Sequence, residues 1–337
     1  MTRRQLPNPQ LIIAFSIAIL LLWFVATQIR LEDTWYVLQR LTATQLLFLI
    51  LLNTLVLATM VIRWHLLLKA KGYSISLWSL FRYRLAAFGV TYLTPGPQFG
   101  GEPLQVYLVT QRYHVPLSAS IAAVTMDKVL EMVANFGFLA GGLLLLLMRG
   151  ILPNVVGYQG LLLALLLLTL PIALSFALWQ GRMPVTTSLE RLTTLSDIWQ
   201  SSPPQWFRRT VELVQESELQ TAQFFRHHPM TLFWTLLITL IGWGLMLVEF
   251  AYAAQSLGVP FTITQLIATL TAARIAFLLP MPAGLGTLET SLVLAFRLLD
   301  FDPAAGLSLS LLIRGRDTLL AVTGLWWGRT SLLPQKL

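Results

Sequence analysis

Long apolar runs separated by short polar stretches set the pattern of this chain. A helix needs roughly 20 apolar residues to cross a hydrocarbon core of ~30 Å. Six runs come close to or exceed that length, and the pattern therefore predicts an all-α polytopic membrane protein. The expected spans are 10–28, 44–68, 117–148, 159–179, 231–257 and 303–327.

Two further apolar segments, 78–115 and 264–300, are interrupted by proline and glycine. The interruptions read TYLTPGPQFGGEP from Thr91 and FLLPMPAGLGTLE from Phe277. Non-helical backbone at membrane depth is tolerated only inside protein or beside a water-filled cavity. We therefore expect two re-entrant, broken helical hairpins, the alternative being ordinary surface loops between short helices. The expected tips are Pro95, Gly96, Pro97, Gly100, Gly101, Pro280, Pro282, Gly284 and Gly286.

The two interruptions belong to a sequence repeat. One offset of 187 positions separates three matching pairs, which are Glu102 and Glu289, Pro116 and Pro303, and Asp127 and Arg314. We divide the chain into an N-terminal span and outer loop (1–43), a first repeat unit (44–148), a connecting span with an inner-surface amphipathic segment (149–230), and a second repeat unit (231–337). An odd number of expected crossings separates the two units, so they are expected to be inverted. Broken helices at matching places of inverted repeats point to a transporter's binding site.

Composition supports the membrane assignment. Hydrophobic residues make up 56% of the chain and charged residues 11%, and the mean hydropathy is +0.70. The net charge of +8 follows from basic residues concentrated on one side of the expected spans, as the positive-inside rule requires. We therefore expect cytoplasmic N- and C-termini in the inner (plasma) membrane, and no nucleic-acid partner.

Ionisable residues inside the apolar segments are the candidates for function, because each costs ~2.5–3.5 kcal/mol at a helix centre and needs a partner or a purpose. Structural pairing is one interpretation, with Glu102 or Asp127 neutralising Arg314 or Arg316, whereas Arg63 is expected to snorkel to the inner interface. Substrate binding and translocation is the other interpretation. The candidates are Glu102, Asp127, Lys128, Glu131, Arg274, Glu289, Arg314, Arg316 and Asp317.

The hairpin tips offer a physical reason to bind anions. Helices that restart after Gly100–Gly101 and Gly284–Gly286 would present free backbone N–H groups and a positive dipole end. A lipid phosphate fits such a place, with Arg274, Arg314 or Arg316 adding charge-assisted hydrogen bonds. A glutamate beside the tip would instead favour a cation or a proton, or cap the helix. The sequence leaves these alternatives open.

Enzyme signatures and cofactor motifs are absent from the sequence. The chain has no cysteine, no HExxH, no GxSxG, no GxGxxG and no P-loop. His65 and His114 are isolated, and we expect no metal site and no cofactor. Asp127 and Glu131 share a helical face, so general acid–base work remains an alternative, although no nucleophile or metal ligand set accompanies them.

The pair TPGPQFGGEP and LPMPAGLGTLE, each followed by a span carrying DKVLE or LIRGRD, resembles the transmembrane, flippase-type region of the lysylphosphatidylglycerol synthase family. The resemblance covers roughly 44 to 328. It implies an inner-membrane protein that moves a phospholipid between leaflets. No soluble aminoacyl-transfer domain follows Leu337, so we expect a stand-alone member that does not make lysyl-lipid.

We therefore expect a lipid translocase with a midplane cavity that takes a membrane lipid as its substrate. The alternatives are a membrane-embedded lipid-modifying enzyme and an accessory subunit of a lipid or polysaccharide synthase. A second copy of the chain or a synthase would be the protein partner.

Overall fold

The computed structural model describes residues 31–94, 100–195, 205–279, 281 and 284–332, and every regular element in these ranges is a helix. The predicted all-α class is confirmed. The helices are α2 (Leu31–Gln39), α3 (Ala43–Ala70), α4 (Leu77–Leu93), α5 (Glu102–Tyr113), α6 (Leu117–Met148), α7 (Asn154–Trp179), α8 (Pro184–Leu195), α9 (Gln205–His227), α10 (Pro229–Ser256), α11 (Ile263–Leu278), α12 (Thr287–Leu298) and α13 (Pro303–Leu332).

Four of these helices, α3, α6, α7 and α10, are long and apolar enough to cross a membrane. They coincide with four predicted spans, which makes this a multi-pass membrane protein. Helix α13 covers the predicted span 303–327. It has 30 residues, or ~45 Å of helix, but it carries Arg314, Arg316 and Asp317. The predicted span 10–28 lies outside the described residues. Both interrupted segments are a helix, a break and a second helix.

The backbone has matching conformations at matching positions of two helix groups, α3–α6 (the first group) and α10–α13 (the second group). Gly72 after α3 and Gly258 after α10 have φ of +88° and +86°, a region in which a residue with a Cβ is strained. Ser76 caps α4 and Thr262 caps α11, each accepting from the backbone N–H three residues later. The two groups therefore share start and stop signals.

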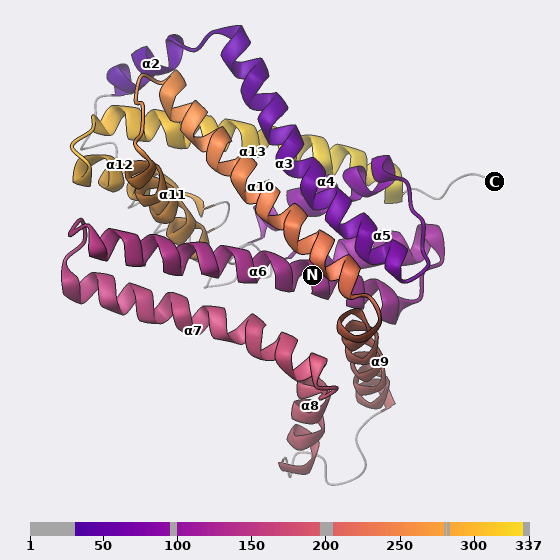
Figure 1. The fold of residues 1–337 in the computed structure, drawn as a ribbon. Helices are drawn as coiled ribbons and strands as arrows, with labels where there is room; N and C mark the ends of the chain where they lie inside the picture. Colours follow the sequence, from indigo (N-terminus) through magenta and orange to yellow (C-terminus); the bar gives the residue numbers. More distant parts are fainter. Residues whose placement is uncertain (1–30, 95–99, 196–204, 280, 282–283, 333–337) are drawn as a thin grey trace, which may run out of the picture.

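Close packing at glycines joins the two groups. In Figure 1, α3 lies beside α10, and the contacts also pair α4 with α13 and α6 with α11. Gly242 of α10 contacts Thr59, Gly324 of α13 contacts the Leu85 carbonyl, and Gly142 of α6 contacts Thr271. Small residues let membrane helices approach closely where no hydrophobic force drives them together.

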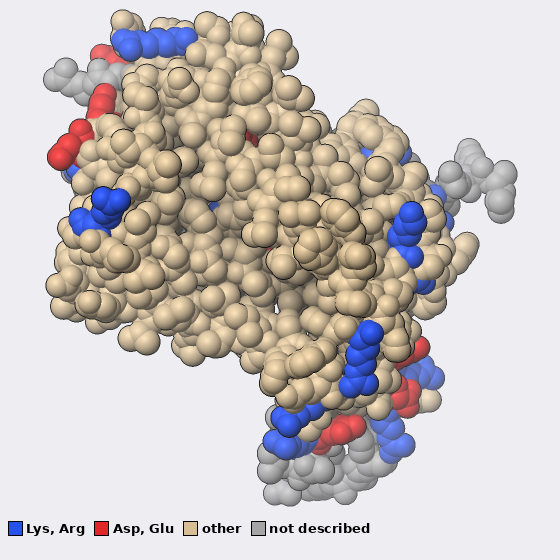
Figure 2. All heavy atoms as spheres, viewed as in Figure 1, with Lys and Arg blue, Asp and Glu red and all other residues tan. Residues whose placement is uncertain are grey.

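The remaining helices are placed around these groups. α7 runs antiparallel to α6, and α8 and α9 extend away from the ends of that pair (Figure 1). Figure 2 shows a wide uncharged face over α6, α7 and α10, with charged side chains toward the ends and over α8 and α9. The sequence analysis was wrong in assigning 31–39 to a loop, and it missed α8. Both helices are short and amphipathic, with too little apolar sequence to resemble a span.

Glu218 of α9 connects α8 to the rest of the protein. Its carboxylate accepts hydrogen bonds from the backbone N–H groups of Val185 and Thr186, both at 2.9 Å, and from the Thr186 hydroxyl at 2.6 Å. Glu218 is 7% exposed. A buried carboxylate at the positive end of a helix satisfies donors that the helix itself leaves free.

Replacing Glu218 with alanine should release α8 from α9. Lost hydrogen bonds to a charged group cost about 1.5–3 kcal/mol each, so amide hydrogen exchange at Val185 and Thr186 should accelerate strongly while α6 keeps its protection. Glu212→Ala, an exposed change on the same helix, is the control. Equal exchange in the two variants would contradict the assigned role of Glu218.

Candidate functional site

The buried charges form two clusters, one in each helix group, and each contains three cations and three carboxylates. The first cluster consists of Arg63, Arg84, Lys128, Glu102, Asp127 and Glu131, and the second of Arg274, Arg314, Arg316, Glu249, Glu289 and Asp317. All nine candidate residues from the sequence lie in these clusters.

Asp127 is the centre of the first cluster. Its two carboxylate oxygens each accept a hydrogen bond at 2.5 Å, one from Arg63 of α3 and one from Arg84 of α4. The side chains of Asp127 and Arg63 are 3% and 4% exposed. The expectation that Arg63 snorkels to the interface is therefore wrong, because a guanidinium with a buried carboxylate partner has no need to reach water. Asp127 holds three helices together.

The rest of the first cluster is more open. Lys128 lies 3.2 Å from Glu102 and 3.3 Å from Glu131, and Arg84 lies 3.6 Å from Glu131. The side chains of Glu102 and Glu131 are 24% and 26% exposed. These two carboxylates can therefore be reached from outside the cluster, whereas Asp127 cannot.

One ion pair of the second cluster has the opposite signs to its counterpart in the first, whereas Glu289, like Glu102, pairs with a cation of the following long helix. Glu249 of α10, which follows Arg63 of α3 by 186 positions and so lies at nearly the repeat offset, pairs at 2.5 Å with Arg316 of α13, which also holds Asp317 at 2.8 Å. Arg314 pairs at 2.5 Å with Glu289 of α12. In the second group a carboxylate on α10 thus pairs with an arginine on α13, whereas in the first group an arginine on α3 pairs with a carboxylate on α6.

Each of the cluster salt bridges given above joins residues of one helix group. The predicted pairing of Glu102 or Asp127 with Arg314 or Arg316 is therefore wrong. Polar contacts between the groups include at least one neutral side chain: Asn53 donates to Glu249 at 3.2 Å, Arg63 donates to Thr239 at 3.1 Å, and the hydroxyls of Tyr92 and Thr318 lie 3.1 Å apart. The salt-bridged charges of each group are therefore neutralised by residues of that same group.

The expected hairpin tips are partly described, since Pro95, Gly96, Pro97, Pro280 and Pro282 lie outside the described residues. Gly100 N–H donates to Glu102 at 2.8 Å and Gly101 N–H to Thr91 at 2.9 Å. Gly284 N–H donates to the Met281 carbonyl. The N–H groups of these three glycines are therefore not free, because backbone that leaves a helix satisfies its own donors first. The expectation of free N–H groups in the first turns of the helices that follow stays a prediction. Gly286, with φ +76°, starts α12.

Arg274 of α11 differs from the other five cations in the clusters. No carboxylate in the described residues lies within salt-bridge distance of it. Its guanidinium lies 4.9 Å from the centre of the Trp243 ring and donates a hydrogen bond to the Met246 sulfur. Glu131 of the first group interacts with it through space. Arg274 therefore retains donors at the seam between the groups.

One face of α6 lines this seam, and it consists of Glu131, Asn135, Phe138 and Gly142, at the spacing of a single helical stripe. Phe138 lies 5.0 Å from Trp243. The buried side-chain amide oxygen of Asn135 has no hydrogen-bond partner in the described residues. The sequence analysis missed Asn135 and Trp243. Asn135 could have been predicted, because it lies one helical turn after the candidate Glu131. Trp243 could not, because a tryptophan is an ordinary residue in an apolar span.

The comparisons with known proteins follow this geometry. The family described as lysylphosphatidylglycerol synthase TM region matches residues 11–324. The chain belongs to the lysylphosphatidylglycerol synthase transmembrane-region family. A UPF0104 membrane protein of Pyrococcus horikoshii is 22% identical over 315 residues, which are 90% of each chain. No solved structure matches. The resemblance carried by the two proline–glycine motifs is thus confirmed for this member of the family.

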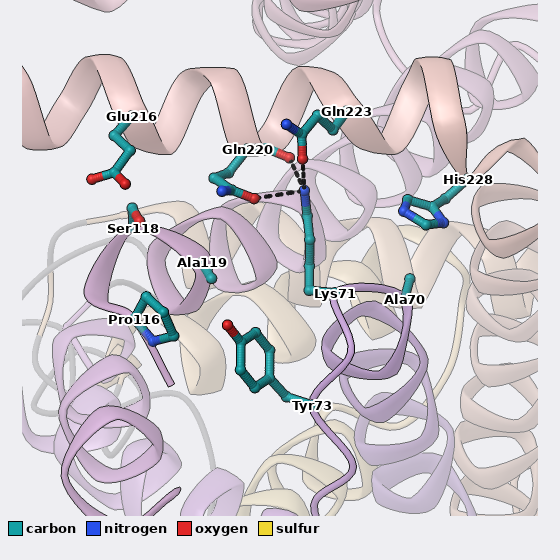
Figure 3. A pocket seen from close by; sticks show the side chains of 10 residues that line it. All are labelled: Ala70, Lys71, Tyr73, Pro116, Ser118, Ala119, Glu216, Gln220, Gln223 and His228. Atoms are coloured by element: carbon teal, nitrogen blue, oxygen red, sulfur yellow. Dashed lines mark hydrogen bonds between the residues drawn. The ribbon is translucent and has the colours of Figure 1, made fainter. Parts of the chain in front are cut away.

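A separate polar pocket of about 310 Å³ lies at the junction of α3, α6, α9 and α10 (Figure 3). Lys71 points across it and donates to the Gln220 carbonyl at 2.5 Å and to the side chains of Gln220 and Gln223, both at 2.9 Å. All three ammonium hydrogens are used, so Lys71 fastens α9 to α3. The polar side chains of this pocket therefore connect helices to one another, and the two charge clusters remain the better candidate site.

Replacing Asp127 with asparagine should destabilise the protein strongly. Breaking a buried ion pair costs about 3–5 kcal/mol, because the remaining charges stay buried without compensation, and here two arginines lose their partner. Thermal unfolding in detergent should show a large drop in midpoint. Asp300→Asn is the matched control, because Asp300 is exposed and asparagine tolerates its positive φ. Equal midpoints for the two variants would exclude the central role of Asp127.

Burial lowers the pKa of Lys71 to about 8, against about 10.4 for an ordinary lysine. Labelling by an amine-reactive anhydride should therefore rise with a midpoint near pH 8. Between these two values the unfolded chain binds a proton that the folded chain has lost, so this group's contribution to stability increases with pH. Exposed Lys69 is the internal reference. A midpoint above pH 10 for Lys71 would contradict the burial of its ammonium.

Proposed function

We propose that this protein is a lipid translocase that moves a phospholipid headgroup between leaflets along the seam between α6 and α11. Arg274 carries the proposal. A guanidinium within an apolar segment is costly without a partner, and the other cations of the clusters already contact carboxylates. The donors of Arg274 suit the phosphate that every phospholipid headgroup contains.

The neighbours of Arg274 define the rest of the proposed headgroup site. Glu131 is 26% exposed and suits a cationic or hydroxylated part of a headgroup. The unpaired Asn135 oxygen accepts one further hydrogen bond. In this proposal the headgroup contacts both helix groups at once, through α6 on one side and α11 on the other.

The proposal includes the arrangement of the chain in the membrane. The units 44–148 and 231–337 are inverted repeats, α4–α5 and α11–α12 are re-entrant hairpins, and both termini face the cytoplasm at the inner membrane. The similar N-caps of α4 and α11, and the glutamate after each break that pairs with a cation of the following long helix, support two related units. Family membership supports a lipid-related role. Alternating access would then occur by movement at the glycine-packed seam, with the salt bridges inside each group intact.

Arg274→Gln should abolish most of the flipping activity without loss of folding. Loss of charge-assisted hydrogen bonds to a phosphate predicts a rate lower by roughly tenfold or more. The measurement is the access of a membrane-impermeant quencher to fluorescent phosphatidylglycerol in proteoliposomes. Glu131→Gln should reduce the rate less, because its carboxylate already pairs with Lys128 and Arg84.

Arg149→Gln is the control, since Arg149 is exposed at the end of α6. All variants should unfold at the wild-type midpoint. Normal flipping by Arg274→Gln would exclude the site, and absence of flipping by the wild type would exclude the function. Recovery of chemically altered lipid would favour a lipid-modifying enzyme instead.

A further inference from the structure

A second pocket, of about 230 Å³, lies where the turn between α7 and α8 meets the last turns of α9. It is separate from both charge clusters and independent of the proposed transport. Its polar lining is cationic or neutral, and no lining residue is acidic. The lining residues are Gly181, Arg182, Met183, Leu219, Ala222, Gln223, Arg226 and His227.

The two arginines of this pocket have unused donors. Arg182 and Arg226 are exposed, and no described carboxylate lies within salt-bridge distance of either. The Arg226 guanidinium lies against Gly181, at the place where a Cβ would stand. Gly181 has φ +81°, so glycine satisfies both the backbone and the space that Arg226 needs. Two like charges on one pocket favour an anion between them.

One part of the pocket lining is apolar. Met183, Leu219 and Ala222 supply this apolar part of the lining. Trp179 ends the membrane-crossing helix α7 just before the pocket and is 56% exposed, as expected of a residue at the membrane–water interface. Figure 2 shows charged side chains gathered over α8 and α9, next to the uncharged face. The pocket thus lies at the level of the lipid headgroups. There a phosphate can contact the arginines of the lining, and the adjoining hydrocarbon can contact its apolar residues.

We propose that this pocket binds a phosphate group between Arg182 and Arg226. A guanidinium presents a planar fork of donors that matches phosphate oxygens, so two arginines can share one phosphate. Basic pockets at membrane ends bind anionic lipid headgroups, and a soluble phosphate offers the same chemistry without the acyl chains. Bound phosphate connects the end of α7 to the end of α9, two residues before α10 begins.

The test compares Arg182→Gln/Arg226→Gln with Arg208→Gln/Arg209→Gln. Both double variants remove two charges at exposed positions, so they weaken general attraction to anionic lipid equally. Bound dimyristoyl phosphatidylglycerol is counted by native mass spectrometry during titration of detergent-solubilised protein. The pocket variant should bind its tightest lipid roughly tenfold more weakly than wild type, and the control variant should match wild type.

Inorganic phosphate distinguishes the two sources. Retention of phosphatidylglycerol in the presence of millimolar phosphate identifies a lipid site, whereas displacement by phosphate, with a raised unfolding midpoint in phosphate alone, identifies a soluble ligand. Either result supports a phosphate site if it is lost in the pocket variant. Equal binding by wild type and pocket variant, or an equal loss in the control variant, would overturn the proposal.

Discussion

A charge inside a membrane-spanning helix bundle must be neutralised by a nearby opposite charge, and the rest of this structure depends on that constraint. Asp127 between Arg63 and Arg84, and Arg316 between Glu249 and Asp317, meet it with contacts of 2.5–2.8 Å. In a low-dielectric interior a partner cannot be removed without leaving an uncompensated charge. These pairs therefore fix how the helices of each group are arranged.

Ion pairs and glycines have different roles in the bundle. Ion pairs connect helices within a group, whereas glycines such as Gly142, Gly242 and Gly324 let the two groups approach each other. Contacts of the second kind are short-range and weak individually, so the movement that we propose for transport would occur between the groups and not inside either of them. Arg274 and Glu131 lie at that boundary, where a passing headgroup would meet them.

The sequence predicted the four spans α3, α6, α7 and α10, because a long run without charge has few alternatives to a membrane helix. It also located the two breaks and nine of the twelve charges in the clusters, since charged residues in apolar runs are conspicuous, but Arg63, Arg84 and Glu249 were not among the candidates. It did not predict the partners. Several oppositely charged residues on neighbouring helices could have paired with Asp127 or with Arg314. Only the three-dimensional packing selects Arg63 as a partner of Asp127 and Glu289 as the partner of Arg314. Asn135 was missed because an uncharged amide in an apolar helix has little weight in a search for charges.

The most direct test of the central claim, that the seam beside Arg274 receives the headgroup, is a structure of the protein in a phosphatidylglycerol-containing bilayer. The account predicts phosphate density within hydrogen-bond distance of the Arg274 guanidinium, between α6 and α11, with the Asp127 and Arg316 salt bridges unchanged. Headgroup density confined to the outer surface, with Arg274 closed onto Glu131, would contradict it.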